Sequence, residues 1–337
     1  MPNIEIINSG LATTIQDLGR IGHQAKGIPV SGAVDQYSHR LANILVNNPE
    51  KSATLEFSLL GPTIKFNVET FIAITGGKSE PVLNDSSISL NTTYPVKKGD
   101  LLTFRPMKSG RFGYIAFAGN GLQVKPILDS QSTNTRLSLG GYYGRSLIKG
   151  DCLTINDCYQ MPSLANRSLS LNEEPIGNSF RFIRGPQWDL FSESAQQLFM
   201  TGPFTISSEA DRMGFRLDGP ILEIPQKNML SEGAVLGNIQ ITRSGQPIAL
   251  LADRQTAGGY PVIATIIGAD LSKFVQFASS RPLVFEQVSL KEATAVLRSQ
   301  YQFLNTLADS IYQKRYQYPI GPTRKASSKI AETILNS

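Results

Sequence analysis

Residues 247–267, PIALLADRQTAGGYPVIATII, decide how the fold is built. This stretch begins with an apolar run, residues 247–251, and ends with a second one, residues 262–267. Short apolar runs bounded by turn residues are typical of buried strands. Between them lies DRQTAGGYP, whose adjacent glycines favour a turn with unusual dihedral angles or close backbone approach. The sequence therefore predicts two strands joined by a polar loop, and such loops commonly carry binding sites.

Short strands separated by Gly, Asn or Pro continue along the chain. Typical examples are residues 71–75, 101–104, 114–117 and 204–207. Strands at this spacing without regular intervening helices favour antiparallel barrels or sandwiches. Helical spacing of apolar residues occurs in only three segments, residues 35–47, 187–200 and 290–312. We therefore predict a mainly β protein with a few helices.

The length of 337 residues and the hydrophobic content of 41% favour two domains with packed cores. Residues 162–179 are rich in Ser, Asn and Leu without a clear period, which is typical of a linker. We place an N-terminal domain at 1–165 and a C-terminal domain at 180–313. Residues 314–337 contain five Lys or Arg and one Glu, and are expected to form a basic, flexible tail.

Composition argues against several classes of protein. The tail carries four of the five net positive charges, so the rest of the chain has no basic stripe for nucleic acid. No apolar run approaches the roughly 20 residues that cross a bilayer, and no signal peptide is evident. Cys152 and Cys158 are expected to be buried free thiols, consistent with the cytoplasm. The sequence lacks four motifs: His, Cys, Asp or Glu at metal-ligand spacing, a nucleophile elbow, a phosphate-binding glycine motif and a biotin-accepting Met-Lys-Met.

Five further segments combine Asp, Arg, Gln, Ser or Thr with glycine outside any helical period. They are residues 13–22, 29–35, 129–133, 140–145 and 209–217. Together with DRQTAGGYP they suggest one shared polar surface. Of the two histidines, His23 lies just after the first of these segments and is a minor candidate for substrate contact, whereas His39 is expected to fill space within a helix.

Six motifs in order resemble the allophanate hydrolase subunit 2 family, also called the biotin-dependent carboxyltransferase family, whose members include the C-type subunits of 5-oxoprolinase. The motifs are QDLGRIG, SGAVDQYSHRLAN, LEFSLLGP, LGGYYGRSLIKGD, ADRMGFRL and LLADRQTAGGYPVIA. The resemblance extends from about residue 4 to residue 288. It implies two related, cyclophilin-like β-barrel domains with the active surface between them.

Amide chemistry requires donors for a developing oxyanion and a carboxylate near the amide N–H. The candidate catalytic residues are Asp17, Asp211, Asp253 and Arg254. The candidate substrate-binding residues are Gln16, Arg20, Arg145, Arg212, Gln255, Thr256, Gly258, Gly259 and Tyr260. The alternative is that the Asp–Arg pairs are structural salt bridges that fix the shape of the loops.

The chain departs from the family where Gln131 replaces an arginine of a Gly-Ser-Arg-Ser-Thr run. Loss of a guanidinium that could hold a carboxylate leaves the substrate open between 5-oxoproline and a urea-like amide. Two other departures, Gly119-Asn120-Gly121 and residues 279–282, are consistent with loop drift.

The resemblance implies three functions. The first is membership of an ATP-dependent 5-oxoprolinase complex, a hydrolase that opens the lactam of 5-oxoproline to glutamate. The chain would act there with a B-type subunit, similar to allophanate hydrolase subunit 1, and with a third subunit. The second is transfer of a carboxyl group from carboxybiotin, on a separate carrier, to urea or a similar amide. The third is a non-catalytic regulator that binds a kinase inhibitor of the subunit 1 type. In each, this chain itself would bind neither ATP nor a metal.

Overall fold

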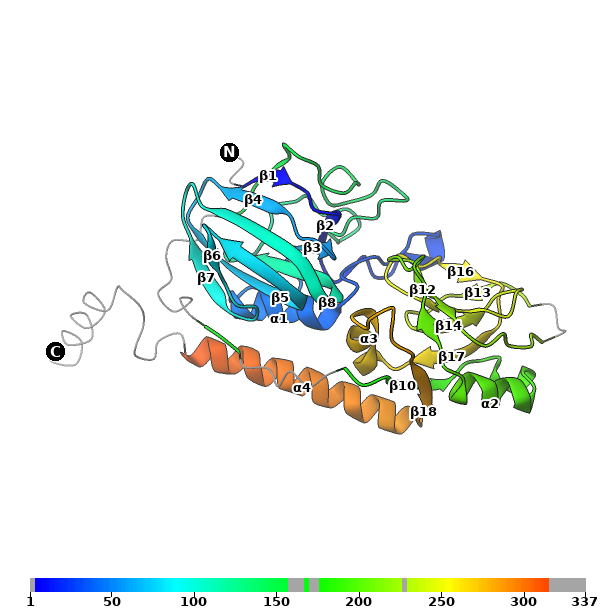
Figure 1. Ribbon diagram of the computed structural model, residues 1–337. Helices are drawn as coiled ribbons and strands as arrows, with labels where there is room; N and C mark the ends of the chain where they lie inside the picture. The colour runs from blue at the N-terminus through cyan, green and yellow to red at the C-terminus, as the bar shows by residue number, and fades with distance from the viewer. Residues whose placement is uncertain (1–3, 157–166, 170–175, 226–228, 315–337) are drawn as a thin grey trace.

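The structure is a computed structural model that describes residues 4–156, 167–169, 176–225 and 229–314 (Figure 1). The predicted tail from residue 315 and most of the predicted linker lie outside these residues. Two curled sheets lie side by side, and a long helix runs beneath both (Figure 1).

The first sheet has nine strands. Six of them follow the order β2-β3-β8-β4-β1-β9; β5 pairs with β8, and both β6 and β7 pair with β5. Its strands are β1 (Ile4–Asn8), β2 (Ala12–Gln16), β3 (Thr54–Ser58), β4 (Thr63–Phe66), β5 (Thr70–Leu83), β6 (Ser86–Ser87), β7 (Thr93–Val96), β8 (Leu101–Phe117) and β9 (Cys152–Leu153). All of these pairings are antiparallel. The long pair β5–β8 shifts register near Lys78, which lets both strands curl without breaking.

The second sheet has seven strands in the order β11-β12-β15-β14-β17-β10-β18. They are β10 (Ser179–Arg184), β11 (Thr205–Ile206), β12 (Gly214–Asp218), β14 (Asn238–Ile241), β15 (Pro247–Leu250), β17 (Val262–Ile266) and β18 (Val284–Gln287). Only β10 and β18 pair in parallel. A separate two-stranded ribbon joins β13 (Glu232–Gly233) to β16 (Ala257–Gly258). The two strands predicted around DRQTAGGYP are β15 and β17, but β14 lies between them.

The described residues form four α-helices: α1 (Gln36–Leu45), α2 (Glu193–Thr201), α3 (Gly268–Val275) and α4 (Leu290–Lys314). Short 3₁₀ turns occupy Gln24–Lys26 and Trp188–Leu190. Asp35 caps α1, because its carboxylate accepts hydrogen bonds from the backbone N–H and the hydroxyl of Ser38. The helix α4 packs against α1 from the first half of the chain and against α3 and β10 from the second.

Two apolar cores organise the molecule. The first core lies inside the first sheet, around Phe57, Phe66 and Phe117. The second fills the second sheet and continues onto α1 and the outer face of β8. Alternation along β8 accounts for this: Ile115 and Phe117 face the first core, whereas Tyr114 and Ala116 face the second. One core therefore joins both sheets, and the domain limits 1–165 and 180–313 stay a prediction.

The predicted fold class, mainly β with few helices and two curled barrel-like sheets, is confirmed. The helices at 35–47 and 290–312 are confirmed as α1 and α4. The segment 187–200 is not one helix, because Ser192 is extended and caps a separate α2. Residues 101–104 and 114–117, predicted as two strands, are the ends of β8, and the sequence did not reveal α3.

The predicted burial of Cys152 is wrong: its side chain is exposed in β9 at the edge of the first sheet, and Cys158 lies outside the described residues. No helix among the described residues is long and apolar enough to span a membrane.

Candidate functional site

Four of the polar loops meet where the two halves of the chain join. The backbone N–H of Ser31 donates to the carbonyl of Ala252 at 3.1 Å, and Asn134 Nδ2 donates to Ser31 Oγ at 3.0 Å. Gln24 Nε2 reaches the carbonyl of Thr256 at 3.0 Å. We call these segments, residues 16–35, 129–134, 211–214 and 251–260, the junction loops. The predicted shared polar surface is thus present in the structure for these segments.

Arg212 holds the junction together. Its Nε donates to Asp253 Oδ2 at 2.8 Å, and its Nη2 donates to Asp253 Oδ1 at 3.2 Å and to the carbonyl of Gly32 at 2.8 Å. Its Nη1 pairs with Glu56 on β3. Burial alone would lower the pKa of Arg212, but the carboxylates of Glu56 and Asp253 outweigh it and raise the pKa above its ordinary value. The guanidinium is therefore a permanent cation engaged entirely by protein oxygens.

Glu56 extends this contact into a buried chain of hydrogen bonds. Tyr114 Oη donates to Glu56 Oε2 at 2.7 Å and accepts from the backbone N–H of Asp35 at 2.8 Å. Gln276 Nε2 then donates to Asp35 Oδ2 at 2.8 Å. Burial, reinforced by Glu56 and Asp35, raises the pKa of Tyr114 well above its usual value, so its hydroxyl stays protonated. We call Gln276, Asp35, Tyr114, Glu56, Arg212 and Asp253 the junction network.

Sequence reasoning missed Glu56, Tyr114 and Gln276. Glu56 stands inside LEFSLLGP, and a carboxylate within an otherwise apolar strand was the one available signal. Tyr114 and Gln276 carried no signal, because both lie in segments that read as ordinary core.

Asp17 is a loop anchor. Its carboxylate accepts hydrogen bonds from Gly19 N at 2.7 Å, Ser130 Oγ at 2.8 Å and Gln131 N at 2.6 Å, and also from Ser132 Oγ. Three of these donors share Oδ1 and one reaches Oδ2, so most of the accepting capacity of the carboxylate is used on the loops. Asp17 thereby joins the loop after β2 to the loop at 129–134.

Arg20 and Gln16 keep unused hydrogen-bonding capacity. Both side chains are fully buried. Arg20 Nη2 donates to the carbonyl of Ser132 at 2.5 Å, and Gln16 Nε2 donates to the carbonyl of Thr133 at 3.1 Å. Arg20 Nη1 and Gln16 Oε1 have no hydrogen-bond partner among the described residues. Burial lowers the pKa of Arg20, and the nearby carboxylates of Asp17 and Asp253 oppose that shift. Such orphaned buried groups call for an explanation, because leaving them unpaired is costly.

Arg254 turns inward and holds the DRQTAGGYP loop. Its Nε donates to the carbonyl of Ala234 and its Nη1 to the carbonyl of Leu251, both at 3.2 Å. Burial lowers the pKa of Arg254. Gln255 Nε2 contacts Gln240 Oε1 at 3.4 Å across the strand end. These contacts fix the shape of the loop, which is a structural role for Arg254 and Gln255.

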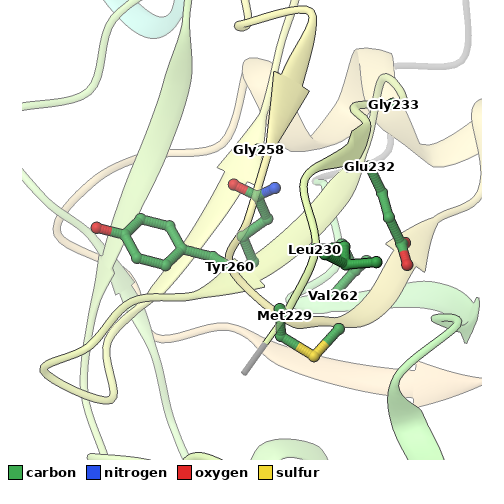
Figure 2. A pocket seen from close by; sticks show the side chains of 8 residues that line it. Met229, Leu230, Glu232, Gly233, Gly258, Tyr260 and Val262 are labelled. Atoms are coloured by element: carbon green, nitrogen blue, oxygen red, sulfur yellow. The ribbon is translucent and has the colours of Figure 1, made fainter. Parts of the chain in front are cut away.

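A small pocket lies beside β16 (Figure 2). Its lining includes Gly258, Tyr260 and Glu232, and Figure 2 shows Tyr260 and Glu232 projecting to opposite sides. A Cβ at Gly258 would lie 2.4 Å from Gln255 Nε2, so a larger residue there would displace the end of that side chain. The pocket holds about 10 Å³, room for roughly one water molecule. The backbone carbonyl of Thr256 accepts the hydrogen bond from Gln24. Gly259 follows Gly258 in the chain, beside this pocket.

Two predicted residues are engaged elsewhere. Asp211 is exposed and its carboxylate accepts the backbone N–H groups of Met213 and Gly214, which makes it the turn residue before β12. Arg145 forms a two-pronged ion pair with Asp151 and lies over the ring of Tyr142. Neither contact reaches the junction network.

The remaining sequence candidates have defined surroundings. Gln131 turns its amide away from the junction and donates to the carbonyls of Leu122 and Val124, at 3.2 and 2.6 Å. His39 is fully buried and contacts Thr54 Oγ1 and the carbonyl of Glu50. The Nδ1 of His23 is buried and unpartnered within the described part of the chain. Among the described residues no group of His, Cys, Asp and Glu could hold a metal ion.

Comparisons with known proteins agree with this architecture. A family model described as "Carboxyltransferase domain, subdomain A and B" matches residues 26–287. The chain is 36% identical over 306 residues to the C subunit of 5-oxoprolinase from Escherichia coli, covering 90% of this chain and 97% of that protein. It is 34% identical over 313 residues to the C subunit of 5-oxoprolinase from Haemophilus influenzae, covering 92% of this chain and 99% of that protein.

The fold also matches part of much larger proteins. The crystal structure of urea carboxylase from Kluyveromyces lactis aligns with a TM-score of 0.82 and 30% identity, covering 91% of this chain and 29% of that one. The urea amidolyase of K. lactis aligns with a TM-score of 0.82 and 29% identity, over 91% of this chain and 20% of that one. The chain spans less than a third of these larger proteins. Family model, full-length relatives and fold confirm the resemblance noted in the motifs: the chain belongs to the carboxyltransferase domain A and B family, which includes the C subunit of 5-oxoprolinase.

Proposed function

We propose that this chain is part of an ATP-dependent 5-oxoprolinase complex that hydrolyses the lactam of 5-oxoproline to glutamate. Two relatives, each named as the C subunit of 5-oxoprolinase, match it over nearly their whole length, which supports this choice. Their name implies further subunits. We propose these to be a B-type subunit, similar to allophanate hydrolase subunit 1, and a third subunit, working together in the cytoplasm in a complex that uses ATP.

The observation that carries the proposal is the pair of orphaned atoms on Arg20 and Gln16. The two side chains are held by the carbonyls of consecutive residues, Ser132 and Thr133, so both are anchored to the same loop. Arg20 Nη1 is a free donor and Gln16 Oε1 is a free acceptor. A lactam presents a carbonyl oxygen and an N–H side by side, and this donor–acceptor pair complements both. Because both atoms are enclosed, we propose that the junction loops move apart when substrate enters.

In this proposal Arg20 stabilises the negative charge that develops on the lactam oxygen, the usual task of a preorganised donor. Of the four predicted catalytic residues, Asp253 is the best placed, because its charge acts on Arg20 and it ends the junction network. Asp17, Asp211 and Arg254 use their polar groups on the loops themselves and are assigned a positioning role.

The test is glutamate release from 5-oxoproline and ATP by the complex of this chain with its partner subunits, with and without this chain. Activity that requires this chain is expected. Replacement of Arg20 by Gln should lower kcat/KM by about tenfold to a hundredfold, the range for losing a charge-assisted hydrogen bond. Arg216→Gln, which removes an exposed guanidinium on β12, is the matched control and should retain full activity. If the partner subunits release glutamate equally well without this chain, the proposal is contradicted.

A second candidate function is carboxyl transfer from carboxybiotin to urea or a similar amide. The match to the K. lactis urea carboxylase favours it, since urea also presents a carbonyl beside an N–H. Here biotin would be carried by a separate protein. Carboxylation of urea by this chain with a carboxybiotinylated carrier, without lactam hydrolysis, would replace the first assignment. Partner binding without either reaction would favour the regulatory role.

A further inference from the structure

A second cavity lies on the helical side of the molecule and shares only Val34 with the junction loops. It is lined by α1 from the first half of the chain and by α3 and α4 from the second; in Figure 1, α1 lies under the first sheet, α3 between the two sheets and α4 below both. Its volume is about 150 Å³. This is roughly the volume of a buried cavity known to hold one benzene molecule. A ligand the size of a single ring therefore fits here, whereas the pocket beside β16 is far smaller.

The lining of this cavity combines apolar and polar side chains. Four leucines, Leu236, Leu271, Leu297 and Leu304, supply apolar surface. Tyr37, Ser272 and Gln300 bring a hydroxyl, a second hydroxyl and an amide to the lining. Burial, with a contribution from Asp35, raises the pKa of Tyr37, so its hydroxyl stays protonated and can donate. Apolar walls with a few convergent polar groups are typical of small-molecule sites.

The charge of the cavity lining indicates which ligands it favours. Arg40 is the one charged side chain among the described residues that line the cavity, and no carboxylate lines it. Its guanidinium lies over the ring of Tyr301 at 5.3 Å, which holds it against α4. Arg40 Nη1 pairs with Glu50, which is not part of the lining. The cavity lining therefore includes one positive charge together with leucine side chains.

We propose that this cavity binds a small carboxylate with an apolar body of about one ring. The carboxylate would contact Arg40 and the hydroxyl of Tyr37, and the ring would pack on the leucines. Because α1 belongs to one half of the chain and α3 and α4 to the other, bound ligand would contact both halves. The cavity includes neither Arg20 nor Gln16, so this inference does not depend on the proposed reaction.

The direct test is titration of the full-length chain with benzoate and, as a neutral isostere, benzamide, followed by calorimetry and thermal unfolding. Benzoate should bind and raise the Tm, and benzamide should bind at least about tenfold more weakly, since it lacks the charge that Arg40 recognises. Equal binding of the two, or no binding of benzoate at millimolar concentration, overturns the proposal.

Two substitutions with opposite expectations locate the site. Arg40→Gln should weaken benzoate binding about tenfold. Glu50→Gln should strengthen it several-fold, because Glu50 no longer competes for the guanidinium. Arg298→Gln removes an exposed charge from the same helix as Tyr301 and should leave the affinity unchanged. Ser272→Phe fills the cavity and should abolish binding while the protein stays folded. If neither Arg40→Gln nor Ser272→Phe changes the affinity for benzoate, the ligand binds elsewhere and the proposal is overturned.

Discussion

At the scale of single residues, hydrogen-bond saturation separates positioning groups from groups that can act on a ligand. Asp17 accepts from four donors and Arg212 donates to Asp253, Glu56 and Gly32, so both are occupied mainly with holding the loops in place. Arg20 and Gln16 each keep one unpaired atom. Residue type alone treats an Asp and an Arg in a polar loop as equal candidates. The partners distinguish them.

Gln131 provides a first prediction. Its amide holds the carbonyls of Leu122 and Val124, so Gln131→Ala should lower the free energy of unfolding by about 1–2 kcal/mol, measured by urea denaturation. Gln131→Arg can reach the same carbonyls and should leave the KM for 5-oxoproline within about twofold. A large gain in activity for Gln131→Arg would instead show that this position faces the substrate.

His39 provides a prediction on pH. Burial, opposed in part by Asp17, lowers its pKa from 6.5 to about 4. Below pH 6.5 the unfolded chain binds a proton at His39 that the folded chain does not. Its contribution to stability is therefore full above pH 6.5 and is lost as the pH falls from 6.5 through about 4. Between pH 7 and pH 5 this loss is about 2 kcal/mol.

The measurement compares urea unfolding of the parent chain and of His39→Gln at both pH values. The variant should be less stable at pH 7 but should lose about 2 kcal/mol less than the parent on going to pH 5. Groups other than His39 titrate equally in both chains and cancel. An identical pH dependence in the two proteins would contradict a neutral, buried His39.

At the scale of elements, the junction loops depend on close backbone approach. Gly140 has φ +70°, and a Cβ there would lie 2.1 Å from the carbonyl oxygen of Ser132 and 2.5 Å from Arg20 Nη2. This glycine lets the loop after residue 139 press on the carbonyl that holds Arg20. Gly150 has a similar φ of +89°, but nothing lies within 4 Å of its Cβ position.

The two glycines form a matched pair for substitution. Gly150→Ala should cost about 1 kcal/mol, the penalty for a left-handed alanine. Gly140→Ala should cost about 1–3 kcal/mol more, because the same strain is joined by a backbone clash. Chemical denaturation of both variants measures the difference. Equal costs would show that the loop at residue 140 moves away without penalty.

At the scale of the whole molecule, the two halves are joined by an apolar core and by the junction network. Gln276 from the second half makes four hydrogen bonds to the first: its Oε1 accepts from the N–H groups of Arg111 and Phe112, and its Nε2 donates to Phe112 O and Asp35 Oδ2. Its side chain sits against β8, at the opposite end of the network from Asp253. This one amide thus contributes four of the contacts that set the relative placement of the halves.

Gln276→Ala should therefore lower the free energy of unfolding by about 3 kcal/mol, because it leaves buried groups unpaired. Gln302→Ala, at an exposed position of α4, should change it by less than about 0.5 kcal/mol. Urea denaturation distinguishes the two outcomes. A loss for Gln276→Ala as small as that of the control would mean that the apolar core alone holds the halves together.

The sequence by itself determined the elements that depend on local patterns and the membership of the family. The period of apolar residues predicted α1, α4 and the strands on either side of DRQTAGGYP, because period and turn residues are read within a short window. It failed at β8, where Pro106 and Gly110 suggest breaks but pairing with β5 keeps one strand continuous. The polar loops were recognised, and their clustering was predicted from their number and shared composition.

Only the tertiary structure decided which polar side chains have unused atoms. Arg20 meets the carbonyl of Ser132, and Glu56 meets Arg212, across separations of more than a hundred residues along the chain. No local pattern encodes such partners, since they are set by how distant segments pack together. The contacts of Asp17 and Gln131 follow from loop packing within the first half, and the cavity between α1, α3 and α4 follows from the packing of the two halves. Residue chemistry supplied the candidates, and three-dimensional proximity assigned each of them its contacts.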